Sequence, residues 1–299
     1  MSKYHDPVLL AECLDGLNIN PKGTYVDVTF GGGGHSRSIV SKLSTGHLYA
    51  FDQDDDALKN EIKDDRFTLI NANFKYLKGS LRMYGVKKID GLLADLGVSS
   101  HQFDVPDRGF STRFEADLDM RMDQNAALNA YKVINEYTQE DLRNILKFYG
   151  ELKRPGTVAR IICEARINGP ISTVSELKSL LKPFTPAMLE NKFFAQVFQA
   201  IRIEVNDELN VLKEMLLQAT DVLNPGGRLV VISYHSLEDR LVKNLIQKGN
   251  FEGELAQDFY GNKILSFKKI SKKPILPSKE EIERNNRARS AKLRVAEKL

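Results

Sequence analysis

The chain has 299 residues, of which 42% are apolar, and a formal net charge of +3 at pH 7. It has no apolar run near the roughly 18 residues of a membrane-spanning helix, and its opening residues lack the apolar segment of a secretory signal. Cys13 and Cys163 are too few and too isolated for a disulfide framework or a zinc site. We therefore expect a protein of the cytoplasm, large enough for one or two domains with a real core.

Positive charge is concentrated at the C-terminal end of the chain. Residues 268–299 contain eleven Lys or Arg and four Glu, a net charge of +7, so the remainder sums to −4. A basic end on a mildly acidic body is typical of proteins that contact phosphate groups. A solvated charged tail is the alternative interpretation.

Strand and helix patterns alternate through the first hundred residues. Predicted strands cover 24–30, 47–52, 67–72 and 89–96, and helices near 35–44, 55–63 and 74–84 lie between them. Nearly continuous apolar strands separated by helices predict a parallel sheet with both faces covered. Right-handed crossovers then give a Rossmann-like order of layers.

The following hundred residues are predicted to be almost wholly helical, with helices over 129–148, 158–167, 172–181 and 187–202. The α/β character then returns, with helices over 207–223 and 237–248 and strands over 228–233, 264–270 and 290–295. The last of these strands is expected at the sheet edge. The simplest interpretation is an α/β, Rossmann-like domain of residues 1–104 and 206–299 with an inserted all-helical domain, residues 105–205, for substrate recognition.

The segment from Tyr25 to His35 predicts a strand, a tight glycine turn and the start of a helix. Asp27, Gly31 and Gly33 fit the spacing D-x-x-x-G-x-G, and glycines let the backbone turn with positive φ beside a ligand. Asp52 ends the next strand, where its carboxylate is placed to accept hydrogen bonds from two ribose hydroxyls. The pattern therefore predicts a nucleoside cofactor, although an ordinary tight turn is the alternative.

Two residues of this segment indicate which class of nucleoside cofactor is expected. Ser36 stands where the dinucleotide fingerprint requires a third glycine. Asp27 precedes the glycines, where an acid suits a cationic or amino-bearing ligand better than a pyrophosphate. The pattern is similar to that of class I methyltransferases, which bind S-adenosylmethionine.

Asp95 ends the fourth predicted strand, so it is expected at the cleft beside the cofactor. A carboxylate there can accept a hydrogen bond from an amino group, and Asp95 is our candidate catalytic residue. The alternative is an Asp that only caps its own loop. The loop Asp95-Leu-Gly-Val lacks the proline and aromatic residue of amino methyltransferases that act on DNA, so Phe103, Phe110 and Tyr234 are hypothesised to stack the target base.

The chain resembles the bacterial methyltransferases that modify N4 of a cytidine in the decoding region of 16S ribosomal RNA. The segments that carry the resemblance run in order along the whole chain, and His5 with Pro7-Val-Leu resembles the opening segment of the family. They are Thr29–Ser36, Asp95–Ser100, Arg108–Ser111, Leu118–Asp123, Phe198–Asn206, Ser233–Arg240 and Arg287–Arg294.

The resemblance implies a set of cofactor contacts and a substrate. Gly33, Gly34 and His35 would line the methionine end of S-adenosylmethionine, Asp52 would hold the ribose, and Phe74 would lie against the adenine. Asp95 and Gln102 would complete the pocket. The implied partner is 16S rRNA or the small ribosomal subunit, and the helical insertion is a candidate for either a dimer face or an RNA clamp.

Four residues are expected to contact the RNA substrate: Arg108, Arg113, His235 and Arg289. We expect no metal site, because the acids at 54–56 are explained by the dipole of a helix that they open. The chain departs from the family near residues 149–157, where Pro155 and Gly156 are expected to break a helix.

Other functions fit part of the sequence. A ribose 2′-hydroxyl or a small molecule is an alternative methyl acceptor, although no lysine stands at the tip of the fourth strand to act as a base. An assembly factor that binds ribosomal subunits and only senses the cofactor is an alternative without catalysis. A nicotinamide dehydrogenase is disfavoured by Ser36.

Overall fold

The structure is a computed structural model that describes residues 7–185, 187–255 and 257–299. His5 of the resembling N-terminal segment lies outside the described residues. The chain divides into two compact units, Met1–Gly97 with Leu209–Leu299, and Val98–Glu208. These boundaries lie three to seven residues from the ends predicted for the inserted domain, 105 and 205.

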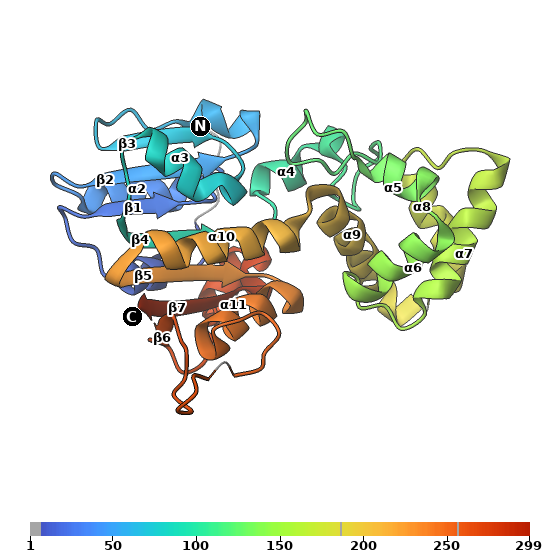
Figure 1. The fold of residues 1–299 in the computed structure, drawn as a ribbon. Helices are drawn as coiled ribbons and strands as arrows, with labels where there is room; N and C mark the ends of the chain where they lie inside the picture. Colours follow the sequence, from blue (N-terminus) through green and yellow to red (C-terminus); the bar gives the residue numbers. More distant parts are fainter. Residues whose placement is uncertain (1–6, 186, 256) are drawn as a thin grey trace. The chain divides into compact units, whose positions relative to one another are not determined.

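The first unit is built on a sheet with the strand order β3-β2-β1-β4-β5-β7-β6 (Figure 1). Its strands are β1 (Thr24–Asp27), β2 (His47–Asp52), β3 (Phe67–Asn71), β4 (Ile89–Asp95), β5 (Leu223–Ser233), β6 (Phe267–Lys269) and β7 (Lys292–Lys298). The pairs among β1 to β5 are parallel, and β7 runs antiparallel to both β5 and β6. The predicted Rossmann-like α/β fold is confirmed.

Helices cover both faces of this sheet because the strand residues alternate between two apolar cores. One core joins Val26, Leu92 and Ala94 to helices α3, α10 and α11. The other joins Tyr25, Leu93 and Ala50 to helices α1 and α2. The helices of this unit are α1 (Leu10–Leu17), α2 (Gly34–Lys42), α3 (Leu77–Met83), α10 (Glu208–Val222), α11 (Ser236–Lys248) and α12 (Lys279–Arg284), with short 3-10 helices η1 (Asp55–Asn60), η2 (Phe74–Tyr76) and η7 (Asn286–Ser290).

The second unit is helical, as its sequence pattern predicts, and has its own apolar core. Its helices are α4 (Ser100–Asp104), α5 (Ala130–Glu136), α6 (Gln139–Phe148), α7 (Pro155–Ala165), α8 (Val174–Leu181) and α9 (Glu190–Asn206), with 3-10 helices η3 (Pro106–Arg108), η4 (Arg166–Asn168), η5 (Lys182–Phe184) and η6 (Ala187–Leu189). No helix in the described ranges is long and apolar enough to cross a membrane.

Two local predictions are wrong and one is confirmed. The single helix predicted over 129–148 is two helices, because Thr138 caps α6 by accepting a hydrogen bond from Asp141 N. The predicted break near residues 149–157 is confirmed, because α6 ends at Phe148 and α7 begins at Pro155, a first helical position where proline leaves no N–H unpaired. The strand predicted at the edge lies between β5 and β6, and the edge belongs to β6.

Candidate cofactor and catalytic site

Three carboxylates stand at the ends of neighbouring parallel strands in the first unit. Asp27 ends β1, Asp52 ends β2 and Asp95 ends β4. Asp27 pairs in register with Ala50 on β2 and Leu93 on β4, so the three strands finish within a few residues of one another. The chain reverses its direction of strand addition at β1 and β4, which is where open α/β sheets bind ligands.

Asp27 holds the glycine loop through hydrogen bonds to its side-chain carboxylate. Its side chain is buried, Oδ2 accepts a 2.7 Å hydrogen bond from the Ser36 hydroxyl, and Oδ1 accepts one of 3.1 Å from Thr29 N. Both oxygens of Asp27 thus accept hydrogen bonds from the loop itself, and its expected preference for a cationic or amino-bearing ligand stays a prediction.

The loop after β1 is bare main chain held in a fixed shape. Gly33 has φ of 75° and caps the start of α2, a backbone conformation that L side chains rarely adopt. A Cβ on Gly34 would stand 2.4 Å from Pro7 Cγ, so the glycine lets the N-terminal segment pack on the loop. The positive φ of Gly33 and the close approach of Pro7 thus both require glycine at these two positions.

Asp52 closes the other side of this loop. Its Oδ2 accepts a 2.7 Å hydrogen bond from Gly31 N, and its Oδ1 accepts one of 2.9 Å from Asp54 N. Burial raises the pKa of Asp52 to about 6, and these two backbone hydrogen bonds act in the opposite direction. Each carboxylate oxygen keeps a second lone pair, which suits it to hold a diol.

Asp95 is joined to β1 and to the segment after β5. Its backbone N donates a 2.7 Å hydrogen bond to Thr29 Oγ1, and its Oδ1 accepts one of 2.7 Å from the Tyr234 hydroxyl. Burial raises the pKa of Asp95, whereas the charge of His35 and the Tyr234 hydrogen bond lower it. The carboxylate also raises the pKa of Tyr234, whose burial is the larger cause. Tyr234 therefore remains a hydrogen-bond donor to Asp95.

His35 faces the second oxygen of Asp95. The His35 Nε2 atom lies 3.0 Å from the carbonyl oxygen of Val8, which can only accept, so Nε2 carries the hydrogen. The Nδ1 atom then faces Asp95 Oδ2 at 3.8 Å, beyond hydrogen-bond distance.

The sequence profile of the MraW methylase family matches residues 2–299. The chain belongs to this family. It is 61% identical over 298 residues to the ribosomal RNA small subunit methyltransferase H of Flavobacterium johnsoniae, covering 99% of this chain and 98% of that one. It is 60% identical over 300 residues to the protein of the same name from Christiangramia forsetii, with 100% and 99% covered. Among solved structures, TrmN from Thermus thermophilus is similar with 12% identity and a TM-score of 0.43, over 97% of this chain and 48% of that one.

This MraW methylase therefore uses S-adenosylmethionine as its cofactor, and the residues at the strand ends fit it. A ribose requires an acceptor such as the Asp52 carboxylate, and a methionine end requires bare backbone such as Gly33 and Gly34. Phe74 opens η2 after β3 with a half-buried ring, which leaves one part of it accessible. The individual cofactor contacts of these residues stay predictions.

Gln102 belongs to the helical unit and forms a reciprocal cap with Ser99. Its Oε1 accepts a 3.1 Å hydrogen bond from Ser99 N, and its own N donates to Ser99 Oγ at 3.2 Å. The side chain is buried. Its predicted contact with the cofactor stays a prediction.

The four residues expected to bind RNA differ in burial and in hydrogen-bond partners. Arg108 is buried, and its guanidinium donates to the carbonyl oxygens of Arg121 at 3.0 Å and Met122 at 3.1 Å. The expectation of a phosphate contact at Arg108 is therefore corrected, because its guanidinium holds a loop. Arg113 is 66% exposed at its side chain, and Arg289 is exposed on η7, so both are accessible to a phosphate.

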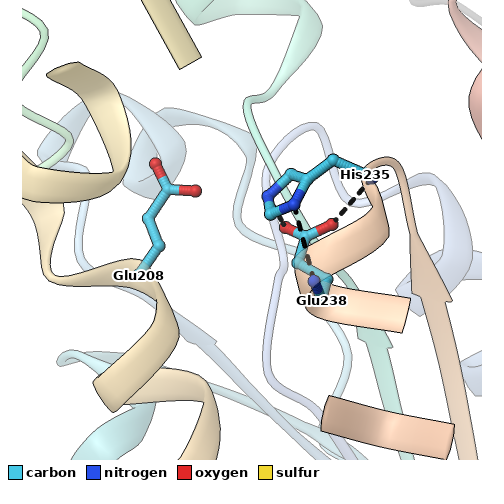
Figure 2. Close-up of side chains that lie close together, drawn as sticks. All are labelled: Glu208, His235 and Glu238. Atoms are coloured by element: carbon cyan, nitrogen blue, oxygen red, sulfur yellow. Dashed lines mark hydrogen bonds and ion pairs between the residues drawn. The ribbon is translucent and has the colours of Figure 1, made fainter. Parts of the chain in front are cut away.

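His235 caps the helix that follows β5. Its Nδ1 accepts a hydrogen bond from Glu238 N, and its Nε2 lies 3.1 Å from Glu238 Oε1 (Figure 2). Glu238 Oε2 in turn accepts from Tyr234 N at 2.9 Å. Glu208, also drawn in Figure 2, receives Arg202 through both carboxylate oxygens, at 2.8 and 2.9 Å. These carboxylates thus have protein partners, and we assign no metal to them.

Tyr234 makes a contact that the sequence did not predict. Its hydroxyl donates a hydrogen bond to Asp95, and its hypothesised stacking on the target base stays a prediction. Phe110 is unsuited to stacking, because its ring is buried in the core of the helical unit. The motif Ser233–Arg240 signalled that the segment after β5 is important, but its spacing in the sequence does not reveal the contact with Asp95.

Proposed function

We propose that this methylase transfers a methyl group from S-adenosylmethionine to the N4 amino group of one cytidine in the decoding region of 16S rRNA. The observation that carries the proposal is the near full-length similarity to small-subunit rRNA methyltransferases, at 61% identity. The resemblance of the seven motifs supplies the nucleotide. The small ribosomal subunit is the proposed partner, the cytoplasm the proposed location and the helical unit the proposed RNA-recognition element.

Asp95 is the proposed catalytic residue. The lone pair of cytosine N4 is delocalised into the ring, so an acceptor beside the amino group is needed to localise it as the new bond forms. When bound, S-adenosylmethionine supplies an electrophilic methyl group. Asp95 accepts a hydrogen bond from N4 and takes its proton as nitrogen gains positive charge.

Tyr234 and His35 are proposed to position and complete this acceptor. The Tyr234 hydroxyl occupies Asp95 Oδ1 and leaves Oδ2 as the oxygen available for the amino group. His35 Nδ1 lies 3.8 Å from that oxygen, and the charge of His35 lowers the pKa of Asp95, which favours the ionised acceptor.

The test is to incubate the protein with labelled S-adenosylmethionine and small ribosomal subunits that lack the modification. The rRNA is then digested and the labelled nucleoside identified by mass spectrometry. We expect N4-methylcytidine at one site. Label in a ribose would transfer the proposal to a 2′-hydroxyl acceptor, and no label with the cofactor bound would favour an assembly factor.

A further inference from the structure

Two aromatic rings stand in solvent at the tip of a turn between α11 and β6. Phe259 is 98% exposed and Tyr260 is 86% exposed, and their ring centroids are 5.6 Å apart at an interplanar angle of 88°. Single exposed apolar side chains are normal on protein surfaces. Two neighbouring rings that are both almost fully exposed are unusual, because a folding chain can bury such rings by collapsing its loop.

The loop does not collapse because its turn is held by backbone and carboxylate hydrogen bonds. Asp258 N donates to Asn262 O at 2.9 Å, and Asp258 Oδ1 accepts from Tyr260 N at 2.9 Å and from Asn262 N at 2.8 Å. Gly261 completes the turn with φ of 80°. The side-chain amide of Asn262 donates to Asp258 Oδ2 at 3.0 Å, and this bond, together with the backbone donors Asn262 N and Tyr260 N, lowers the pKa of Asp258.

The base of the turn is fixed to the first unit. A Cβ on Gly249, at the end of α11, would stand 2.4 Å from the carbonyl oxygen of Ile264. The backbone of Ser266 accepts a 3.1 Å hydrogen bond from Leu299 N next to β7. The turn that carries the rings is therefore held in one conformation, and little conformational entropy of the chain is lost when a partner binds them.

The surroundings of the rings are basic. Residues 257–273 contain five lysines (Lys263, Lys268, Lys269, Lys272 and Lys273) against the single acid Asp258, a net charge of +4. Lys263 pairs with Gln257 at the base of the turn, and Lys268 follows on β6 at most about 18 Å further along the chain. Stacking rings flanked by phosphate-binding cations are the combination that binds unpaired nucleotides.

We propose that the turn Gln257–Lys263 is a second RNA-binding element, whose two rings stack on unpaired bases of the small-subunit rRNA while the lysines hold the flanking phosphates. The proposal rests on the proposed function for the identity of the RNA. The turn would bind the substrate outside the strand-end site, so that variants of the turn should change rRNA affinity without changing the rate of the methyl-transfer step.

The test compares variants of the full chain in binding to protein-free small-subunit rRNA across a series of salt concentrations. Phe259→Ala with Tyr260→Ala is expected to weaken binding at least about 25-fold, because stacking on each of two bases contributes a factor of roughly five or more. The dependence of log K on log salt should stay unchanged, since all lysines remain. Lys263→Ala with Lys268→Ala should reduce that slope by roughly two.

Three further variants separate stacking from other causes. Phe259→Trp with Tyr260→Phe keeps two rings and should retain affinity, whereas Phe259→Leu with Tyr260→Leu should bind as weakly as the alanine pair. Met83→Ala removes an apolar side chain that is 86% exposed on α3 and should change nothing. Melting temperature and S-adenosylmethionine affinity of the ring variants should match wild type, because the rings are not buried.

Retained affinity in the alanine pair would overturn the proposal, and so would full rescue by leucine, because a leucine side chain has no ring to stack on a base. Methyl transfer by the wild type is measured in parallel. If the wild type methylates N4 and the alanine pair binds rRNA normally, only the turn is misassigned. If the alanine pair loses rRNA affinity but the wild type modifies another atom, only the proposed function is wrong.

Discussion

The contact between Tyr234 and Asp95 allows the most direct test of the proposed catalytic role of Asp95. Tyr234→Phe removes one hydroxyl and keeps the ring, so Asp95 Oδ1 loses a 2.7 Å charge-assisted hydrogen bond. Hydrogen bonds to charged groups contribute about 1.5–3 kcal/mol. The Asp95 side chain is 23% exposed, so water replaces part of the loss and the lower figure applies. We expect the rate of methyl transfer to fall about tenfold, since 1.4 kcal/mol corresponds to a factor of ten.

The pH dependence of this variant distinguishes positioning from mere packing. The Tyr234 hydrogen bond lowers the pKa of Asp95, so its removal raises that pKa. Because Asp95 must be ionised to accept the N4 proton, the acidic limb of the rate profile should move to higher pH. The other groups that act on Asp95 remain in place: His35 on α2, Asp27 on β1, and Glu238 on α11.

The assay is single-turnover methylation of small subunits at saturating S-adenosylmethionine, measured across a pH series. Tyr137→Phe is the matched control, because its hydroxyl donates a hydrogen bond of the same 2.7 Å length to Glu204 in the helical unit. That variant should leave the acidic limb in place. Wild-type rates for Tyr234→Phe with an unmoved limb would refute the positioning role, provided that calorimetry shows normal cofactor binding.

Two further predictions concern the cofactor and the arginines. Since burial raises the pKa of Asp52 to about 6, affinity for S-adenosylmethionine should fall as the pH drops below about 6 and the carboxylate is protonated. Calorimetry should show that Asp52→Asn binds the cofactor at least about tenfold more weakly at pH 7.5 and that its affinity does not change between pH 5 and 7. A wild-type affinity that is flat over that range would contradict the assignment. Arg108→Ala should destabilise the fold by roughly 1–3 kcal/mol in denaturant unfolding with no change in the salt dependence of rRNA binding, whereas Arg113→Ala should leave stability intact and reduce the salt slope by about one. The reverse pattern would return Arg108 to the RNA surface.

The sequence by itself determined the sheet and the ends of its strands. Nearly continuous apolar strands and the helices between them are local patterns along the chain, and the glycine loop follows from local backbone conformation at Gly33. Because carboxyl ends of parallel strands meet at one edge, the sequence also placed Asp52 and Asp95 at that edge correctly. It did not predict α1 or α12, which have only eight and six residues.

Only the tertiary structure decided what the side chains at that edge contact. The hydrogen bond between Tyr234 and Asp95 joins residues 139 positions apart, and the tautomer of His35 depends on the carbonyl of Val8, 27 positions away. Arg108 has the composition of a phosphate ligand, yet packing buried its guanidinium against two carbonyl oxygens. Sequence spacing fixes which residues share an element, whereas hydrogen-bond partners between elements are fixed when the sheet and its helices pack.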